Sequence, residues 1–150
     1  MSDGKIRKPG GAMAAVISES PEGLRYLLLH NADYLPGQPD GDWSWGPPSG
    51  CREPFDADIA ACAARELFEE TGISGEPVPV ITEDIDWAIF YLRVPWGTAV
   101  RLDPAEHNDY AWCTVEEATR RCRPERLAES FRHAVAATRQ SPTCQNESTL

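Results

Sequence analysis

The chain has 150 residues and a formal net charge of −10, and hydrophobic residues make up 41% of it. This length suits one domain with a single core, and the composition is that of a globular protein. The acidic excess disfavours nucleic-acid polymers as ligands, because binding to them depends on Lys and Arg neutralising phosphates. No apolar run approaches the roughly 20 residues of a membrane helix, and the polar start lacks a signal peptide's apolar stretch. We therefore expect a soluble, cytoplasmic monomer or homodimer without membrane or polymer partners.

The first third of the chain predicts a hairpin followed by a long loop. Residues 1–11 are polar and predict a flexible arm. Residues 12–18 and 25–30 predict two strands, and the turn Pro21-Glu-Gly23 lies between them. The stretch 31–50 is rich in Gly, Pro and Asp, so it predicts a loop with at most a short strand around its two tryptophans.

The rest of the chain predicts a central helix, further strands and terminal helices. Residues 58–71 are rich in Ala, Leu and Glu and predict a helix that ends at Gly72. The elements expected after it are strands at 83–94 and 110–113, a helix that begins with the capping box Thr114-Val-Glu-Glu117, and a last helix at 125–139. A domain over 12–140 and a disordered tail over 141–150 follow. This order predicts an α/β fold with a mixed sheet between helices.

The central helix carries an acidic stripe. Glu66, Glu69 and Glu70 stand at positions i, i+3 and i+4 and share one side of the helix, with Arg65 beside them. Such like-charge pairs cost on the order of a few tenths of a kcal/mol each. Solvent and Arg65 offset this cost on an ordinary acidic surface. The alternative is a divalent cation, which carboxylates, waters and substrate phosphates hold together. The spacing alone leaves both interpretations open.

The order of residues along this helix is more specific than their spacing. Arg65-Glu-Leu-Phe-Glu-Glu-Thr-Gly-Ile73 matches R-E-U-x-E-E-x-G-U, with U aliphatic, at every specified position. This pattern is the helical half of the Nudix box, and Pro48-Ser-Gly-Cys-Arg-Glu-Pro-Phe-Asp56 resembles the loop of that box, P-G-G-x-x-E-x-G-E. The chain therefore resembles the Nudix hydrolases. The resemblance implies a Nudix fold over 12–140, with its mixed sheet sandwiched between helices.

The loop half departs from the box at four points. Ser49 and Phe55 stand where the box has glycines, and Asp56 stands where it has glutamate. One additional residue separates Asp56 from Arg65. A glycine that needs a positive φ is not replaced by Phe without a local adjustment. The additional residue can supply that adjustment, so the departures affect the loop more than the acidic stripe.

The resemblance implies a metal cofactor and a set of roles. The cofactor is Mg²⁺, with Mn²⁺ as a substitute, and the implied ligands are Glu66, Glu69, Glu70 and the Ser49 carbonyl. Arg65 is implied to position the acids of the box, paired with Asp56. Glu66 is also a candidate base, as is Glu106, whose alternative interpretation is a plain loop carboxylate.

Two flanking segments resemble those of diadenosine tetraphosphate hydrolases. Trp45-Gly-Pro-Pro-Ser-Gly50 matches W-x-P-P-x-G, and the segment 106–112 matches E-H-x-x-Y-x-W. This likeness implies that His107 and Tyr110 contact phosphate or base. That subgroup typically has lysine where this chain has Ser49. The further candidates for stacking on a base, each with a packing role as the alternative, are Tyr34, Trp43 and Trp87.

Three functions follow as hypotheses. The first is a magnesium-dependent pyrophosphohydrolase of a small nucleotide, namely diadenosine tetraphosphate or a nucleoside triphosphate. The second is a hydrolase of ADP-ribose or another nucleotide sugar. The third is a catalytically weak Nudix-fold module that binds a nucleotide. Such modules commonly lose acids of the box, and this chain keeps all three acids of the helix.

Overall fold

The computed structural model describes residues 8–140, which form a seven-stranded mixed sheet and three helices. In chain order the elements are β1 (Gly11–Ser20), β2 (Gly23–Asn31), β3 (Trp45–Gly46), β4 (Ser49–Cys51), α1 (Ile59–Thr71), β5 (Val78–Val80), β6 (Trp87–Arg93), β7 (His107–Cys113), α2 (Val115–Arg121) and α3 (Glu125–Gln140). Most of the arm predicted over 1–11 and all of the tail predicted over 141–150 lie outside the described residues. Gly11, the last residue of that arm, already belongs to β1.

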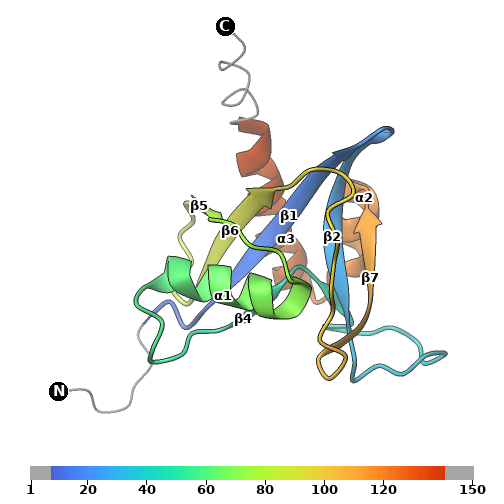
Figure 1. Ribbon diagram of the computed structural model, residues 1–150, viewed down its shortest axis with the longest axis horizontal. Coiled ribbons are helices and arrows are strands. Elements are labelled where there is room, and N and C mark those ends of the chain that lie inside the picture. Colours follow the sequence, from blue (N-terminus) through green and yellow to red (C-terminus); the bar gives the residue numbers. More distant parts are fainter. Residues whose placement is uncertain (1–7, 141–150) are drawn as a thin grey trace, which may run out of the picture.

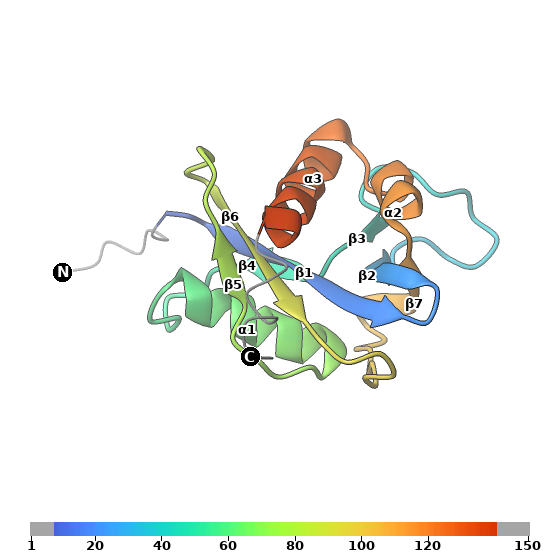
Figure 2. The same cartoon turned by 90° about the horizontal axis from the view of Figure 1, so that it is seen from above.

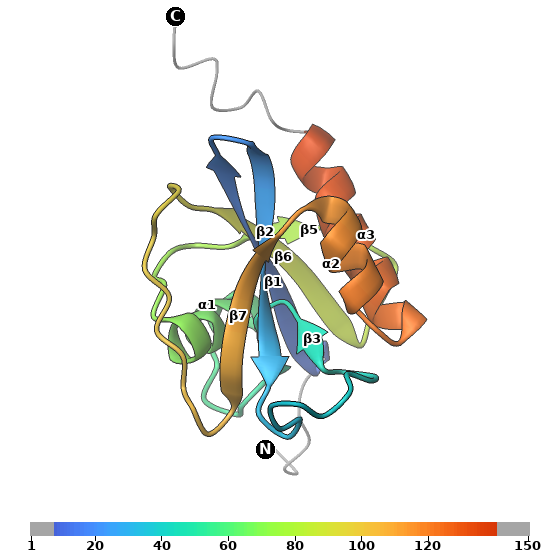
Figure 3. The same cartoon turned by 90° about the vertical axis from the view of Figure 1, so that its right-hand side faces the viewer.

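Strand β1 lies at the centre of the sheet and is buried on both faces. Its successive side chains point to opposite sides, as the pleat of a strand requires. Met13, Ala15 and Ile17 join the core shared with α2 and α3, whereas Ala14 and Val16 pack with residues of α1. Figure 3 shows α1 on one side of the strands and α2 and α3 on the other. The predicted α/β architecture, a mixed sheet between helices, is confirmed.

The sheet forks beside β1. One edge of β1 pairs in parallel with β6 from Gly11 to Ile17. The other edge pairs with β4 over Gly11–Met13 and with β2 over Ile17–Ser20, both antiparallel. Farther along β2 the edge that faced β1 pairs with β3, while the opposite edge of β2 pairs with β7 over Tyr26–Asn31. The two halves of the sheet therefore diverge, and the segment that runs from β3 into β4 lies between them (Figures 1 and 2).

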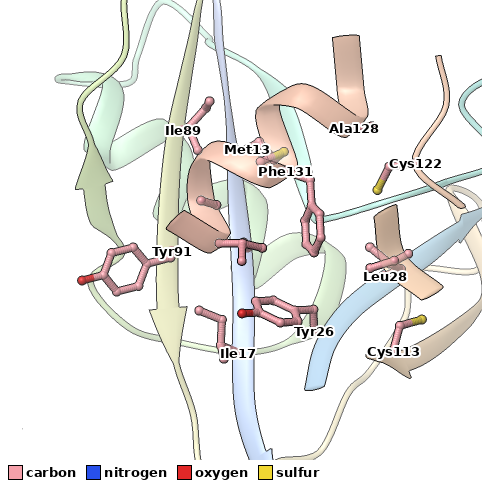
Figure 4. Packing of buried hydrophobic residues seen from close by; sticks show 14 of the residues in the cluster. Met13, Ile17, Tyr26, Leu28, Ile89, Tyr91, Cys113, Cys122, Ala128 and Phe131 are labelled. Carbon is pink, nitrogen blue, oxygen red and sulfur yellow. The ribbon is translucent and has the colours of Figure 1, made fainter. Parts of the chain in front are cut away.

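The core beneath α3 is built around aromatic and aliphatic side chains (Figure 4). Tyr26 and Phe131 meet edge to face, with ring centroids 5.2 Å apart. Met13 and Leu28 are fully buried beside them. This packing fixes α3 against the sheet. Within residues 8–140, no helix is both long and apolar enough to span a bilayer.

The three predicted helices are confirmed. In α1 the Asp58 side chain accepts the N–H of Ala61, and Gly72 ends the helix in the left-handed conformation at φ 76°. The capping box of α2 is formed by Thr114 and Glu117.

The strands differ from the prediction in four main places. The strand expected from residue 83 begins only at Trp87, because the Asp84 side chain accepts the N–H groups of Asp86 and Trp87 and forms a turn. Strand β5 was not predicted, because it contains Pro79, which is tolerated at the edge of a sheet. Strand β7 begins at His107, three residues before the prediction, and β4 was not predicted at all.

Candidate functional site

The loop that follows β3 meets α1 around a cavity of about 350 Å³. The structure brings six of the predicted site residues to this cavity, from β4, α1 and the segment before β7. The complete lining is Ser49, Gly50, Cys51, Glu53, Arg65, Glu66, Glu69, Glu70, Asp103 and Glu106. Six of these ten residues are acidic, so the cavity concentrates negative charge.

Buried Glu70 and half-buried Glu66 form the least exposed part of this cavity. Glu70 is only 6% exposed, and its carboxylate accepts the N–H of Ser49 at 3.0 Å. Its side chain is also hydrogen-bonded to that of Glu66. Burial raises the pKa of Glu70 to about 9; the Ser49 N–H opposes this shift, and the charges of Glu66 and Glu106 add to it. Burial likewise raises the pKa of Glu66.

The pair Glu66 and Glu70 fits a hard cation. Two buried carboxylates side by side are unfavourable when both are ionised, and a positive charge between them removes that penalty. Carboxylate oxygens are ligands that Mg²⁺ prefers. Within residues 8–140, no group of three or more His, Cys, Asp and Glu side chains forms a metal centre by itself. A cation here would therefore draw its remaining ligands from backbone, water or substrate phosphate.

The backbone of Gly50 lies directly against the carboxylate of Glu66. A Cβ atom added at Gly50 would lie 2.1 Å from Cδ of Glu66 and 2.2 Å from one of its oxygens. Real Cβ atoms never approach other atoms so closely, so any other residue at this position would push the Glu66 carboxylate away. Glycine at position 50 is thus a requirement of the site.

Arg65 ties the loop to the helix. Its Nε and Nη2 donate to both oxygens of Asp56 at 2.9 and 2.8 Å, and Nη2 also donates to the Cys51 carbonyl at 3.1 Å. Its Nη1 donates to Glu66 and Glu69, each at 3.2 Å. The hydrogen bonds from Arg65 lower the pKa of Asp56 to about 2, and Asp56 raises the pKa of Arg65 in return. The expected pairing of Arg65 with Asp56 is therefore present.

Two other residues of the box segment, Glu69 and Phe55, are exposed to solvent. The side chain of Glu69 is 56% exposed and lies at the outer edge of the cavity. Phe55 is exposed too, with the Arg65 guanidinium 5.3 Å from its ring centroid. Among the described residues other than glycine, only Trp43 has a positive φ. Phe55 thus occupies an ordinary backbone conformation, although the box has glycine there.

A second and larger cavity, a cleft of about 1000 Å³, meets the acidic cavity at Ser49, which lines both. Of the predicted residues, Trp43, Trp87 and His107 line this cleft. Nδ1 of His107 is buried without a hydrogen-bond partner, and burial lowers the pKa of its ring. His107 thus lines the cleft with a buried ring nitrogen that has no protein hydrogen-bond partner.

Tyr34 and Tyr110, two further candidates from the sequence, line neither cavity. The Tyr34 hydroxyl donates to the Asp42 carbonyl at 2.7 Å and so holds its loop. Tyr110 shares one face of β7 with Trp112, two residues farther on, and Trp112 packs against the cluster of Leu67 on the α1 side of the sheet.

Sequence reasoning did not find the wall that α3 contributes to the cleft. Arg126, Ser130 and His133 line it. They stand at positions i, i+4 and i+7, which place them on one side of a helix. This polar stripe was a usable signal, but its spacing alone does not distinguish a ligand-binding wall from a solvated helix face.

The comparison with family models shows the family of this chain, and the solved structures show its fold. The family model described as NUDIX domain matches residues 8–137. No curated protein sequence matches significantly. Among solved structures, the binary complex of an Ap4A hydrolase from C. elegans has a TM-score of 0.60 and 20% identity, covering 85% of this chain and 97% of that one. A putative Nudix hydrolase from Listeria monocytogenes has a TM-score of 0.65 and 14% identity, covering 93% and 96%. Dihydroneopterin triphosphate pyrophosphohydrolase from E. coli has a TM-score of 0.62 and 17% identity, covering 84% and 94%.

The contact between Gly50 and Glu66 predicts the effect of a single methyl group. Gly50→Ala should displace the Glu66 carboxylate without unfolding the protein, because the displaced group is the end of a flexible side chain. Misplacement by about 1 Å costs roughly 10²-fold in turnover. Steady-state kinetics and a thermal melt measure both effects. Gly10→Ala, whose Cβ would meet only one atom at 3.8 Å, is the matched control. Equal turnover for the two variants would contradict the prediction.

The ion pair between Arg65 and Asp56 predicts a pH-dependent contribution to stability. Asp56→Asn should lower the free energy of unfolding by roughly 3 kcal/mol at pH 7, because it leaves Arg65 short of its main partner. Because the pKa of Asp56 is lowered from 3.8 to about 2, the ionised carboxylate stabilises the fold fully at pH values above 3.8. This contribution is lost as the pH falls toward about 2. The difference between wild type and variant in urea unfolding should therefore narrow below about pH 4. The exposed Asp33→Asn serves as control, and a difference independent of pH would refute the assignment.

Proposed function

The chain belongs to the Nudix family of hydrolases, which act on pyrophosphate bonds, and we propose that it is a magnesium-dependent enzyme that cleaves a nucleoside polyphosphate. The observation that carries the proposal is the junction at Ser49 between an acidic cavity and a larger aromatic cleft. A ligand with phosphates at one end and a base at the other matches this division. Its phosphates lie at the acidic cavity through a cation, and its nucleoside lies in the cleft.

The residues proposed to hold the cation are Glu66, Glu69, Glu70 and the Ser49 carbonyl. Bound Mg²⁺ supplies positive charge that offsets the negative charge developing on the anhydride. Arg65 positions the acids through its bonds to Asp56 and Glu66. The cation also explains how a chain with a net charge of −10 holds a polyphosphate.

Glu106 is the proposed general base. It lies in the acidic cavity on the segment before β7, separate from the acids of α1. Its carboxylate takes the proton of the water that attacks phosphorus. In the cleft, Trp43 and Trp87 offer indole faces to the base, and His107, which lines the same cleft, is the proposed contact to the nucleoside.

A dinucleoside polyphosphate such as diadenosine tetraphosphate is the leading substrate. The support for it is the pair of segments 45–50 and 106–112, which supply Ser49, Glu106 and His107 to the two cavities. The fold of the C. elegans Ap4A hydrolase adds to this support. Nucleoside triphosphates and ADP-ribose are the alternative substrates within the family.

A nucleotide panel with identification of products tests the proposal. Purified protein with Mg²⁺ should hydrolyse diadenosine tetraphosphate faster than ATP or ADP-ribose, and chelation should abolish the activity until Mg²⁺ is restored. Hydrolysis in ¹⁸O water then shows which phosphorus is attacked. Nucleotide binding without turnover would contradict the proposal and support a binding module.

Replacing the proposed base should separate chemistry from metal binding. Glu106→Gln should lower kcat by roughly 10²- to 10⁴-fold, the usual range for loss of a general base. Stabilisation of the protein by Mg²⁺, followed as a shift in Tm, should persist because Glu106 is not a proposed ligand. The exposed Glu116→Gln is the matched control. A variant with normal kcat would return Glu106 to the role of a plain loop carboxylate.

Replacing a proposed metal ligand, unlike replacing the base, should abolish the stabilisation of the protein by Mg²⁺. Without metal, Glu70→Gln should raise Tm, because it removes one of two adjacent buried carboxylates while the amide still accepts from Ser49. Added Mg²⁺ should raise Tm of the wild type and leave that of the variant nearly unchanged. Differential scanning calorimetry at fixed pH measures both shifts. Equal responses to Mg²⁺ would remove Glu70 from the ligand set.

A further inference from the structure

Trp43 has an unusual backbone conformation at the rim of the cleft. Its φ of 67° is in the left-handed region, which residues with a bulky side chain rarely adopt. Neighbouring elements hold both of its backbone polar groups. The Trp43 N–H donates to the Arg123 carbonyl at 2.7 Å, and the Asn31 side chain donates to the Trp43 carbonyl at 3.3 Å. Strain that is held this firmly at a cavity points to a function for the side chain.

The side chain of Trp43 faces a planar cation from α3. The Arg126 guanidinium lies 5.2 Å from the centroid of the indole, and both residues line the cleft. Trp43 nevertheless remains 45% exposed. The guanidinium therefore lies against the indole ring, and the indole still keeps part of its surface exposed. We call Trp43 and Arg126 the stacking pair.

The charge of the cleft indicates which part of a nucleotide the stacking pair meets. Glu83, Asp84 and Asp86 line the cleft from the segment before β6, and Glu129 lines it from α3. In the part of the chain that the structure describes, Arg126 is the only Lys or Arg in this lining. Such a lining repels a polyphosphate and accepts an uncharged aromatic group. The stacking pair is thus placed for a nucleobase.

We propose that Trp43 and Arg126 together form the platform on which the purine base of the substrate stacks. This inference rests on the proposed function, and it adds Arg126 as a residue that determines specificity. Base stacking on aromatic side chains and on guanidinium planes is an established mode of recognition. A purine has a larger ring surface for stacking than a pyrimidine does, so the platform favours purines. Lysine cannot replace Arg126, because an ammonium group is not planar.

Binding of uncharged nucleosides tests the platform without metal and without turnover. In EDTA, adenosine should quench the tryptophan fluorescence of the wild type saturably, and cytidine should bind more weakly. Arg126→Gln and Arg126→Lys should each weaken adenosine binding by about tenfold. Arg132→Gln is the matched control, since Arg132 lies on the same helix and pairs with the exposed Glu125 outside the cleft. Unchanged affinity in both Arg126 variants would overturn the proposal, as would a wild type that binds no purine nucleoside.

A substitution at Trp43 distinguishes recognition from structural support. Asparagine adopts the left-handed conformation more readily than tryptophan, so Trp43→Asn should keep or raise Tm while adenosine binding falls about tenfold. The exposed Trp96→Asn, outside the cleft, should leave adenosine affinity unchanged. Normal adenosine affinity in Trp43→Asn would overturn the platform.

The two proposals can fail separately. A wild type that binds adenosine through Trp43 and Arg126 but hydrolyses no anhydride would refute the proposed function and leave the platform intact. A wild type that hydrolyses diadenosine tetraphosphate with the same KM as Arg126→Gln would refute the platform and leave the hydrolase intact.

Discussion

The close approach of the Gly50 backbone to the Glu66 carboxylate governs the geometry of the acidic cavity. The same loop donates the Ser49 N–H to Glu70, and Arg65 binds it through Asp56 and the Cys51 carbonyl. Loop and helix are therefore held together by polar contacts on both sides of the carboxylate pair. The arrangement keeps half-buried Glu66 beside buried Glu70, which is costly when both are ionised unless a positive charge joins them. A bound cation would therefore stabilise the packing of the loop against α1.

The forked sheet explains why this acidic cavity borders a cleft. Because β1 pairs with β4 at one end and with β2 at the other, the two halves of the sheet separate and leave room for the loop between them. One side of that loop faces the acids of α1, and the other opens toward α3. The lining changes along the same line, since the cleft adds indole faces and the His107 imidazole, which the acidic cavity lacks. A molecule that is anionic at one end and aromatic at the other fits this division.

Much of this arrangement was predictable from the sequence, and the limits have physical causes. The acidic stripe of α1 follows from spacing along one helix, and the Arg65 pairing follows from the box. Local sequence does not reveal β4, whose three residues Ser49–Cys51 are held in the sheet by pairing with β1. It also does not reveal that Arg126 lies over Trp43, because that contact joins elements far apart in the chain. Tyr110 was predicted to contact the substrate but lines neither cavity, because a motif match gives no information about which face of β7 a residue occupies.

The most direct measurement of the central claim is a crystal structure with Mg²⁺ and a nonhydrolysable diadenosine tetraphosphate analogue. The account predicts a cation coordinated by the carboxylates of Glu66 and Glu70 and by phosphate oxygens of the analogue, with one adenosine in the cleft beside Trp43. A cation bound elsewhere, with the two glutamates still hydrogen-bonded to each other while the phosphates lie outside the acidic cavity, would contradict it.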